Sequence, residues 1–330
     1  MSKFMTAAVY NGPKQIDVQQ VRYPEPPEGC SLIKVAYCGI CGTDLNIYGG
    51  GHPRAHAPLI MGHEFSGLVY GHPSIEDGKS VTVLPLLYCG DCKPCNEGFS
   101  HICETLNLIG IDCDGGMAQF VAVPNEKVIP LPDSMSLKAG ALIEPFAVAV
   151  HAIRESKFKP GDSTTVFGAG PIGLCVALVL RCFGAKEITV VEPNSYRKNI
   201  STELGFHTLD PVKDDIPKND LVYDCAAHPT VAEKLVEKTH VRGEIVLVGA
   251  YKKPTPLDLQ NITFKELSIK GTRVYTDIDY EIAMKLINEH PDCEKIITHV
   301  VDIKNSSQLL KELSEGANIV KAVVSFNLEN

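Results

Sequence analysis

The sequence lacks any apolar run long enough to cross a bilayer. The longest such run, from Leu174 to Leu180, has seven residues, whereas a spanning helix needs about 20 residues. The N-terminal segment MSKFMTAAVYNG also lacks the sustained apolar stretch and small-residue cleavage site of a secretory leader. We therefore expect a cytoplasmic protein with no membrane partner.

The sequence also lacks a surplus of basic residues. It has 40 acidic against 31 basic residues and a formal net charge of -9, and no basic cluster reverses this balance locally, which argues against a nucleic-acid partner. There is no low-complexity tract, and the hydrophobic content of 44% is typical of a globular protein. A chain of 330 residues exceeds the usual size of a single core, so two domains are expected.

Cysteine is plentiful and unevenly placed. Four of the twelve cysteines fall within fifteen residues, at Cys89, Cys92, Cys95 and Cys103. In a reducing compartment such clusters are more often metal ligands than disulfides. Four thiolates with no open position describe a structural zinc site, while an iron-sulfur cluster, the alternative, commonly uses other spacings. We expect a structural zinc lobe over residues 88–104.

A second cluster upstream has a mixed composition. Cys41, His63 and Glu64 offer a thiolate, an imidazole and a carboxylate, a set that suits a catalytic zinc with room for water or substrate. Glu144 stands in apolar surroundings, where an unpaired carboxylate is costly. It is either a fourth ligand, a support for the other ligands, or an acid at a helix start just before Pro145.

A dinucleotide pattern begins near residue 163. A β-branched strand, Thr164 to Phe167, leads into a glycine turn and an apolar helix, and a second strand, Glu187 to Val191, ends at Glu192. The turn residues expected to approach the cofactor are Gly168, Gly170, Pro171, Ile172 and Gly173. A G-x-G-x-x-G turn in this strand and helix context, with a terminal acid, predicts a Rossmann domain whose helix N-terminus binds a pyrophosphate.

Glu192 bears on the choice of cofactor. Its carboxylate is expected to accept hydrogen bonds from the adenosine ribose and to repel a 2′-phosphate, which predicts NAD over NADP. Arg197 lies close enough in sequence to weaken that preference.

The ordered motifs C-G-T-D, G-H-E, the four-cysteine lobe, E-P and G-x-G-P-x-G resemble the zinc-dependent medium-chain alcohol dehydrogenases. Within them, His63-Glu64 and E-P-F-A-V at 144–148 resemble the polyol and sugar dehydrogenase branch. The resemblance implies an α/β protein with a GroES-like, mostly β catalytic domain and a Rossmann doubly wound parallel sheet. It places the catalytic domain at 1–147, the NAD-binding domain at 148–288, and a return to the catalytic domain at 289–330.

The family pattern also implies roles. Cys41 rather than Cys38 is the catalytic ligand, and zinc acts as a Lewis acid while a hydride passes from the substrate to NAD. Thr43 matches the hydroxyl that takes the alcohol proton. Where relatives usually carry a histidine in the proton relay, this chain has Asn46, which cannot titrate near neutral pH. Protons would then leave through water.

The substrate implied by the branch is a small polar polyol or sugar acid. Arg273, in KGTRVYT, follows a strand expected over Leu267 to Lys270 and would suit a carboxylate or phosphate, although a structural ion pair is an equal alternative. Tyr48 and its neighbours His52 and Arg54 are further candidates for the pocket, with exposed-loop roles favoured.

The implied function is an NAD-dependent zinc dehydrogenase with two zinc ions per chain, one catalytic and one structural. L-threonine 3-dehydrogenase or a 2,3-diol dehydrogenase is the alternative, because these enzymes share the same ligands. A non-catalytic NAD- and zinc-binding protein is a distant third. The family association suggests a homotetramer or a homodimer.

Overall fold

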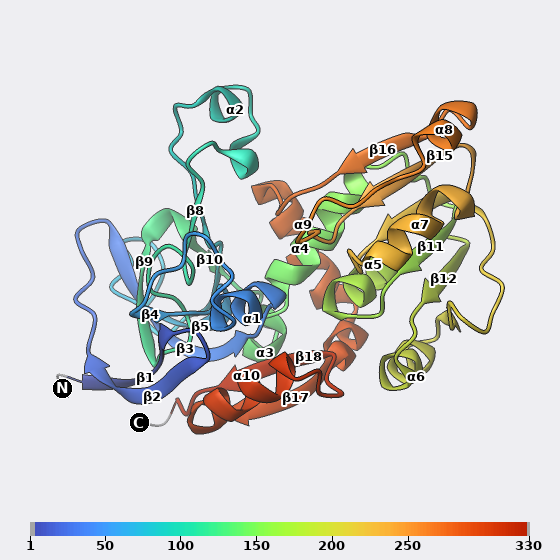
Figure 1. Ribbon diagram of the computed structural model, residues 1–330. Helices are drawn as coiled ribbons and strands as arrows, with labels where there is room; N and C mark the ends of the chain where they lie inside the picture. The colour runs from blue at the N-terminus through green and yellow to red at the C-terminus, as the bar shows by residue number, and fades with distance from the viewer. Residues whose placement is uncertain (1–3, 329–330) are drawn as a thin grey trace. The chain divides into compact units, whose positions relative to one another are not determined.

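The computed structural model describes residues 4–328 and divides into two compact units (Figure 1). Unit 1 runs to Glu144 and resumes at Ile287, while unit 2 spans Pro145–Leu286. The outer ends of the expected first and last domains, residues 1–3 and 329–330, lie outside the described residues. Within residues 4–328, no helix combines the length and the apolar character that a bilayer crossing needs.

Unit 1 is mostly β. Its seven-stranded sheet has the order β10-β6-β5-β3-β18-β17, and β9 pairs with β3 beside this path. These strands are β3 (Cys30–Gly39), β5 (Glu64–Tyr70), β6 (Ser80–Val83), β9 (Phe120–Pro124), β10 (Val128–Pro130), β17 (Ile297–Asp302) and β18 (Lys321–Ser325). In β3, Ser31, Ile33 and Val35 are buried at alternate positions, as expected where successive side chains point to opposite faces.

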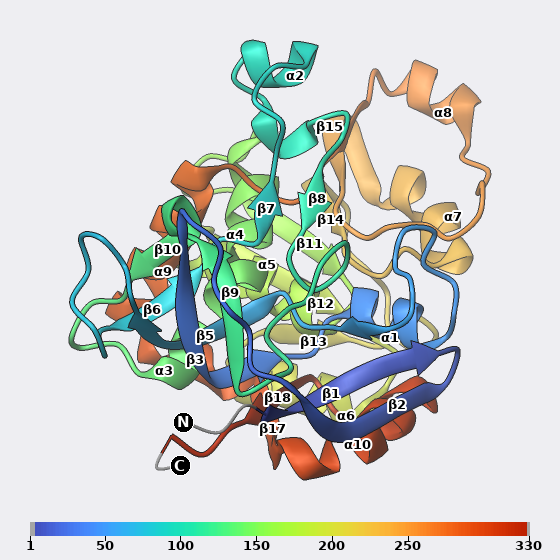
Figure 2. The same cartoon turned by 90° about the vertical axis from the view of Figure 1, so that its left-hand side faces the viewer.

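Two smaller sheets complete unit 1. One has the order β2-β1-β4 and the other pairs β7 with β8. Their strands are β1 (Phe4–Gly12), β2 (Gln15–Arg22), β4 (Leu59–Ile60), β7 (Leu86–Leu87) and β8 (Asn107–Leu108). The helices are α1 (Gly42–Tyr48), α2 (Lys93–Asn96), α3 (Leu137–Gly140) and α10 (Ser306–Ser314), with 3-10 turns η1 (Ser100–Ile102), η2 (Asn125–Lys127), η3 (Pro291–Ile296) and η4 (Ile303–Asn305). The segment between β7 and β8 carries α2 and projects from the rest of unit 1 (Figures 1 and 2).

The C-terminal segment returns to the first strands of the chain. β18 pairs antiparallel with β3, so that Val324 lies opposite Cys38, and β17 runs parallel to β18. α10 packs against β2, where the Ser307 hydroxyl donates to the Ile16 carbonyl at 2.8 Å. Figure 1 shows these red elements beside the blue N-terminal strands. The seven-stranded sheet is therefore completed by strands from residues 297–325.

Unit 2 is built on one parallel sheet of six strands, in the order β13-β12-β11-β14-β15-β16. The strands are β11 (Ser163–Phe167), β12 (Glu187–Val191), β13 (His207–Leu209), β14 (Asn219–Asp224), β15 (Thr239–Leu247) and β16 (Ser268–Gly271). The helices are α4 (Ile143–Arg154), α5 (Pro171–Cys182), α6 (Ser195–Glu203), α7 (Pro229–Lys238), α8 (Leu259–Phe264) and α9 (Asp277–Glu289), of which α4 starts and α9 ends in unit 1. The expected strands around the glycine turn and the doubly wound sheet are confirmed.

The core of unit 2 lies against this sheet. Every residue from Leu174 to Leu180 is buried, because α5 is apolar on all sides and lies over the strands. One cluster of the core joins α7 to the sheet through Phe167, Val222 and Leu235. A parallel sheet needs such apolar cover. The apolar run from Leu174 to Leu180 is therefore part of a core helix.

A buried carboxylate ties α4 to α9. Asp279 is fully buried; it accepts hydrogen bonds from His151 Nδ1 at 2.8 Å and from the Thr276 backbone N–H at 2.8 Å, and it pairs with Arg154. Burial alone would raise the pKa of Asp279, but the donors around it outweigh burial and hold that pKa well below the usual value.

We expect Asp279→Asn to lower the free energy of unfolding by about 3 kcal/mol at pH 7, because it breaks a buried ion pair. A carboxyl whose folded pKa is depressed stabilises the fold above its unfolded pKa of about 4, and this stabilisation fades as the pH falls below that value. Urea unfolding should therefore show that the free energies of unfolding of wild type and Asp279→Asn differ less at pH 3.5 than at pH 7. Asp277→Asn, on the exposed side of the same helix, is the matched control, and an equal loss in both variants would contradict the assignment.

Candidate functional site

The register of two neighbouring strands brings three candidate ligands together. Gly39 at the end of β3 lies opposite Glu64 at the start of β5. Cys41 follows β3 by two residues, and His63 directly precedes β5. One ligand atom from each of Cys41, His63 and Glu64 lies within 4.8 Å of the others. Antiparallel pairing thus places a thiolate, an imidazole and a carboxylate at one end of the sheet.

Cys38, the nearby alternative thiol, faces elsewhere. It is fully buried, and its Sγ lies 3.6 Å from the Gly39 carbonyl, to which it donates. Burial raises the pKa of the Cys38 thiol well above its usual value. It does not belong to the group formed by Cys41, His63 and Glu64. Because a metal ligand must be a thiolate, the environment of Cys38 disfavours that role.

Asp44, which the sequence argument did not single out, supports two of these residues. It is fully buried in α1, and its Oδ2 accepts a hydrogen bond from the Cys41 backbone N–H at 2.8 Å. Its Oδ1 lies 3.8 Å from His63 Nδ1, and neither atom has a hydrogen-bond partner among the described residues. A proton on Nδ1 would face this carboxylate and leave Nε2 free for a metal, which is the usual orientation of a metal-bound histidine.

The electrostatics of His63 agree with this arrangement. Burial alone would lower the pKa of His63, but the Asp44 carboxylate and the Cys41 thiol outweigh it, and the pKa is raised well above the usual value. Glu144 adds to the same effect. Since a ligating imidazole has no proton on the coordinating nitrogen, binding of a metal releases a proton from this cluster.

Lys321 is the second residue that sequence reasoning missed. It lies in β18, is 1% exposed, and forms an ion pair with Glu64, which is also 1% exposed. Its Nζ donates a second hydrogen bond to the Ile40 carbonyl at 3.0 Å. Burial alone would lower the pKa of Lys321, but Glu64, Cys41 and Glu144 outweigh it and raise that pKa. The sequence signal for Lys321 is a lysine inside the apolar run IVKAVV.

Glu144 lies near this cluster without joining it. It is buried in the first turn of α4, and its charge raises the pKa of both His63 and Lys321. The group within 4.8 Å contains Cys41, His63 and Glu64 only. The position of Glu144 therefore favours support of the cluster over direct contact with the same ion.

Thr43 and the residues expected around a substrate have different surroundings. The Thr43 side chain is half-buried in α1 and makes no hydrogen bond within residues 4–328. Tyr48 is buried, with 7% exposure, at the end of the same helix.

Arg54 pairs with Asp112 at 3.4 Å and donates to the Leu106 carbonyl, so its guanidinium has structural partners. His52 Nδ1 accepts the Ala55 backbone N–H at 3.3 Å.

The four-cysteine lobe has the geometry of a closed thiolate site. The sulfur of Cys92 lies 3.4 Å from that of Cys95 and 3.8 Å from that of Cys103, which is 3.5 Å from that of Cys89. A tetrahedral zinc with bonds of about 2.3 Å places its sulfurs about 3.8 Å apart. The Cys89 backbone N–H lowers the pKa of Cys103 to about 6, which favours the thiolate of this one cysteine, whereas burial raises the pKa of Cys95. The lobe fits a structural zinc.

The glycine turn in unit 2 depends on close backbone approach. Gly168 follows β11 with a φ of +99°, a left-handed conformation that favours glycine. A Cβ on Gly173 would lie 1.9 Å from the Gly168 carbonyl oxygen, whereas a Cβ on Gly170 would meet open space. Gly170 precedes α5, and Pro171 occupies the first turn of that helix, with Ile172 next to it. The turn therefore leaves the helix N-terminus open to an anion.

Glu192 lies beside this turn, as expected from the end of β12. It is buried, and its carboxylate accepts the Ala169 N–H at 2.8 Å and the Asn194 N–H at 2.9 Å. Each carboxylate oxygen retains a lone pair for a ribose hydroxyl. Arg197 is half-buried, and its side chain makes no ion pair within the described part of the chain.

A second buried acid shapes the same edge of the sheet. Asp224, at the end of β14, accepts hydrogen bonds from the Ala226 N–H at 3.1 Å, the Ala227 N–H at 3.0 Å and the Tyr251 hydroxyl at 2.6 Å. A Cβ on Gly168 would lie 3.3 Å from Ala226. Asp224 thus fixes the loop that packs under the glycine turn. Asp224 was not predicted from the sequence.

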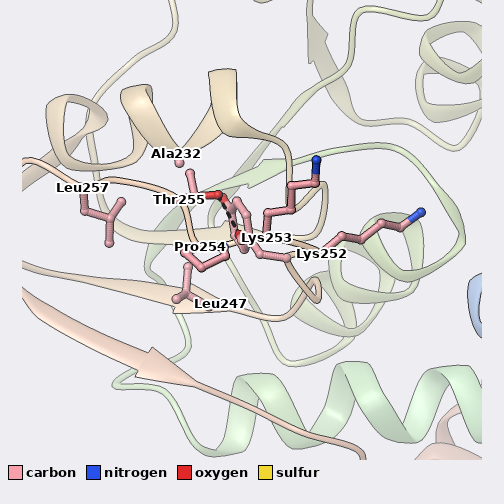
Figure 3. A pocket seen from close by; sticks show the side chains of 8 residues that line it. Ala232, Leu247, Lys252, Lys253, Pro254, Thr255 and Leu257 are labelled. Carbon is pink, nitrogen blue, oxygen red and sulfur yellow. Dashed lines mark hydrogen bonds between the residues drawn. The ribbon is translucent and has the colours of Figure 1, made fainter. Parts of the chain in front are cut away.

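A cavity of about 390 Å³ lies near this edge, lined by Ala232, Leu247, Tyr251, Lys252, Lys253, Pro254, Thr255 and Leu257. In Figure 3 the ammonium groups of Lys252 and Lys253 point away from Leu247 and Leu257. The Thr255 hydroxyl donates to the Lys253 carbonyl at 3.1 Å. None of the predicted cofactor residues lines this cavity. Arg273 is exposed after β16, and its side chain has no hydrogen bond or ion pair to the described residues.

Comparison with known proteins agrees with these features. Residues 27–133 match the alcohol dehydrogenase GroES-like domain, and residues 171–289 match the zinc-binding dehydrogenase domain. The chain is similar to 2-dehydro-3-deoxy-L-galactonate 5-dehydrogenase of Pseudoalteromonas atlantica, with 33% identity over 98% of this chain and 100% of the relative. It is equally similar, at 33% identity, to (R,R)-butanediol dehydrogenase of Bacillus subtilis, over 96% of this chain and 99% of the relative.

A solved structure shares the fold. An alcohol dehydrogenase of Escherichia coli, complexed with NADH, superposes with a TM-score of 0.91 at 27% identity, over 98% of this chain and 100% of that chain. The similarity extends over both units. The first family domain contains Cys41, His63, Glu64 and the four-cysteine lobe, and the second begins at Pro171, within the glycine turn. This chain therefore belongs to the zinc-dependent medium-chain alcohol dehydrogenase family.

Proposed function

We propose that the protein is a zinc-dependent dehydrogenase that transfers a hydride between a secondary alcohol of a polyol or sugar acid and NAD. The convergence of Cys41, His63 and Glu64 within 4.8 Å carries this proposal. The glycine turn and Glu192 in unit 2 support the cofactor assignment. Relatives that span nearly the whole chain and act on sugar acids and diols support the substrate class.

The residues of unit 1 fit a catalytic zinc. One thiolate, one imidazole and one carboxylate are ligands that zinc accepts, and three protein ligands leave a position for substrate. Cys41, His63 and Glu64 would hold the ion, and Glu144 would support them. When bound, zinc supplies Lewis-acid polarisation of the substrate hydroxyl. The Cys89, Cys92, Cys95 and Cys103 lobe would hold a second, structural zinc.

Thr43 has the chemistry and the freedom to move a proton. Oxidation of an alcohol releases its hydroxyl proton, and a hydroxyl side chain can accept one proton while it donates another. Thr43 stands two residues after Cys41 and has no competing hydrogen bond within the described residues. Asn46, one turn further along α1, cannot titrate near neutral pH. The proton therefore passes from Thr43 to water or cofactor hydroxyls.

Unit 2 supplies the groups that bind NAD. Backbone N–H groups at the start of α5, after the turn Gly168–Gly173, favour the pyrophosphate. Glu192 accepts the ribose hydroxyls, and its charge repels a 2′-phosphate. NAD supplies the nicotinamide ring that exchanges a hydride with the substrate.

The substrate is a sugar acid or polyol. The Pseudoalteromonas relative is named for a deoxygenated galactonate, which carries a carboxylate and vicinal hydroxyls. Arg273 is exposed and has no internal partner in residues 4–328, so its guanidinium is free to meet a carboxylate in bidentate fashion. Tyr48, buried at the end of α1, stays a candidate contact. These features favour a hexonate-type substrate over a simple alcohol.

A vicinal diol is the second candidate. The Bacillus relative, an (R,R)-butanediol dehydrogenase, matches this chain at the same identity of 33%. Butanediol has the two neighbouring hydroxyls of a polyol but no carboxylate. A preference for diols over hexonates would show that Arg273 does not select the substrate.

Metal-replete protein should be assayed with NAD on hexitols, hexonates, their phosphates, 2,3-butanediol and L-threonine, with the appearance of NADH at 340 nm as readout. We expect a hexonate or polyol to give the highest kcat/KM. Turnover of only L-threonine or only 2,3-butanediol would show that the substrate belongs to another class used within the same family. NADH binding without oxidation of any compound would contradict the proposed function.

Glu192→Ala should narrow the preference for NAD over NADP by about 10- to 100-fold, because it removes charge-assisted hydrogen bonds and the repulsion of a 2′-phosphate. The ratio of kcat/KM for the two cofactors measures this effect. Glu187→Ala, at the exposed start of the same strand, is the control and should leave the ratio unchanged. An unaltered ratio of kcat/KM in Glu192→Ala would show that Glu192 does not select between NAD and NADP.

We also propose that the enzyme is a homodimer or homotetramer in the cytoplasm. None of the twelve cysteines forms a disulfide, and both zinc sites need thiols in the reduced state. Light scattering coupled to gel filtration gives the copy number. A monomer at micromolar concentration would contradict the expected assembly.

A further inference from the structure

We propose that Lys321 is a positioning residue that holds one oxygen of the Glu64 carboxylate, so that Glu64 meets the catalytic metal through its other oxygen only. This inference rests on the proposed metal site and deepens it. It concerns a lysine that comes from the last strand of the chain and that no step of the reaction otherwise uses.

The contacts of Lys321 define one orientation of Glu64. Nζ pairs with Glu64 Oε2 and donates to the Ile40 carbonyl at 3.0 Å. Ile40 directly precedes Cys41, so the ammonium spans from the loop that carries one candidate ligand to the side chain of another. The paired side chains are each 1% exposed, and solvent cannot replace either contact. Only Glu64 Oε1 lacks a bond to this ammonium.

The backbone leaves a space for this pair. A Cβ on Gly39 would lie 2.1 Å from Glu64 Oε2, 3.2 Å from Glu64 Cβ and 3.1 Å from Lys321 Cε. Any larger residue at this position would displace the carboxylate or the lysine stem. The register of the sheet creates the same proximity, because Gly39 lies opposite Glu64 in β5 and opposite Val323 in β18.

Charge explains why the cation is needed. Glu64, Cys41 and Glu144 all act on Lys321 electrostatically, so several acidic groups crowd a buried site. A buried carboxylate without a partner is costly. If the lysine were absent, the metal would be the remaining cation for Glu64, and both carboxylate oxygens would turn toward it. Lys321 therefore limits Glu64 to one oxygen and leaves room for substrate at the ion.

The ion pair of Lys321 and Glu64 joins distant segments of unit 1. Lys321 and Glu64 are 257 residues apart in sequence, and β18 inserts between β3 and β17. The C-terminal strand therefore brings a charged group to a site whose ligands come from the first 64 residues. Correct docking of this strand is part of the arrangement of the metal site.

Cobalt substituted into the catalytic site of the full-length protein tests the inference without turnover. The variants are Lys321→Met, which removes the charge, Lys321→Arg, which keeps it, and Lys311→Met, an exposed lysine in α10, as the control. We expect Lys321→Met to weaken the visible d–d bands, as a higher coordination number would. We also expect metal affinity by chelator competition to rise about tenfold or more, because a positive charge near the ion is lost.

The other two variants test whether the charge at position 321 determines the cobalt spectrum. Lys321→Arg should restore the wild-type spectrum, and Lys311→Met should match it throughout. Weaker metal binding with an unchanged spectrum in Lys321→Met would mean that the lysine only holds the fold, and would overturn the inference. If Lys321→Met does not fold, Gly39→Ala, whose Cβ would crowd both Glu64 Oε2 and the Lys321 stem, must alter the cobalt spectrum, and an unchanged spectrum there would be equally decisive.

Failure of this inference is distinguishable from failure of the proposed function. The cobalt spectrum and the chelator competition report the ligand set whether or not a substrate is known. The substrate panel on wild-type protein reports the activity whether or not Lys321 positions Glu64. A wild-type enzyme that turns over hexonates, with an unaltered spectrum in Lys321→Met, would refute only the role of the lysine.

Discussion

Cys41→Ser is expected to reduce kcat/KM by at least about 1,000-fold and to lower the zinc content from two ions per chain to one. The thiolate is the strongest ligand of the proposed catalytic site, and serine does not ionise to replace it. Loss of the ion removes the polarisation of the substrate hydroxyl, which supplies several kcal/mol to the transition state. Atomic absorption on the purified variant measures the metal, and NADH formation measures the rate.

The chain offers a matched control three residues earlier. Cys38→Ser changes a buried thiol that lies next to the Gly39 carbonyl and outside the ligand group, so both zinc ions should remain. NADH binding, followed by fluorescence, should be unaltered in Cys41→Ser because the glycine turn lies in unit 2. Retention of two zinc ions and of activity in Cys41→Ser would show that Cys41 is not a ligand.

Thr43→Val is expected to reduce kcat by about 100- to 10,000-fold, the range for loss of a proton-transfer group. Valine replaces the hydroxyl of threonine by a methyl group of similar size, and the half-buried Thr43 side chain makes no hydrogen bond within the described residues. Metal content and NADH affinity should therefore stay within about twofold of wild type. Steady-state kinetics on the best substrate of the panel, together with NADH titration, separates the two effects.

Thr43→Ser is the conservative counterpart, because it restores the hydroxyl without the methyl group. It should recover most of the rate. Equal losses of rate and of NADH binding in Thr43→Val would indicate misfolding of α1. An unchanged rate would show that the alcohol proton leaves by another route.

Local motifs predicted the parts of the site that depend on local chain geometry. The four cysteines of the lobe lie within fifteen residues, and their turns include Gly90 and Gly98 with φ values of +82° and +85°, so spacing alone indicated a closed metal site. The strand, the glycine turn and the second strand were predictable for the same reason, since each occupies a continuous stretch. Glu192 lies at the end of the strand that follows the turn, where the sequence placed it.

Contacts between distant strands were not predictable in this way. Lys321 meets Glu64 because β18 returns to pair with β3, and nothing within either segment encodes that pairing. Asp44 belongs to the quoted C-G-T-D motif, but its approach to His63 depends on the register of β3 and β5. Asp224 owes its role to a loop that packs under Gly168. Lys321 and Asp44 thus acquire these partners through the sheet, whereas Asp224 acquires its partners through loops.

The residues proposed to contact a substrate were also hard to predict from sequence. Arg54 and Tyr48 come from the same loop region, yet Arg54 is held by Asp112 and the Leu106 carbonyl, while Tyr48 is packed at the end of α1. A cation or an aromatic residue in a polar loop has too many potential partners for sequence alone to choose among them. Arg273 has no partner within the described residues, and its contact with a substrate stays a prediction.

Diffraction at the zinc absorption edge, from crystals grown with NADH, tests the central claim most directly. Two anomalous peaks per chain are expected, one within the four sulfurs of the lobe and one bounded by Cys41 Sγ, His63 Nε2 and Glu64 Oε1, with the nicotinamide ring in hydride range of the open position. A single peak in the lobe, or a second peak away from residues 41 and 63, would contradict it.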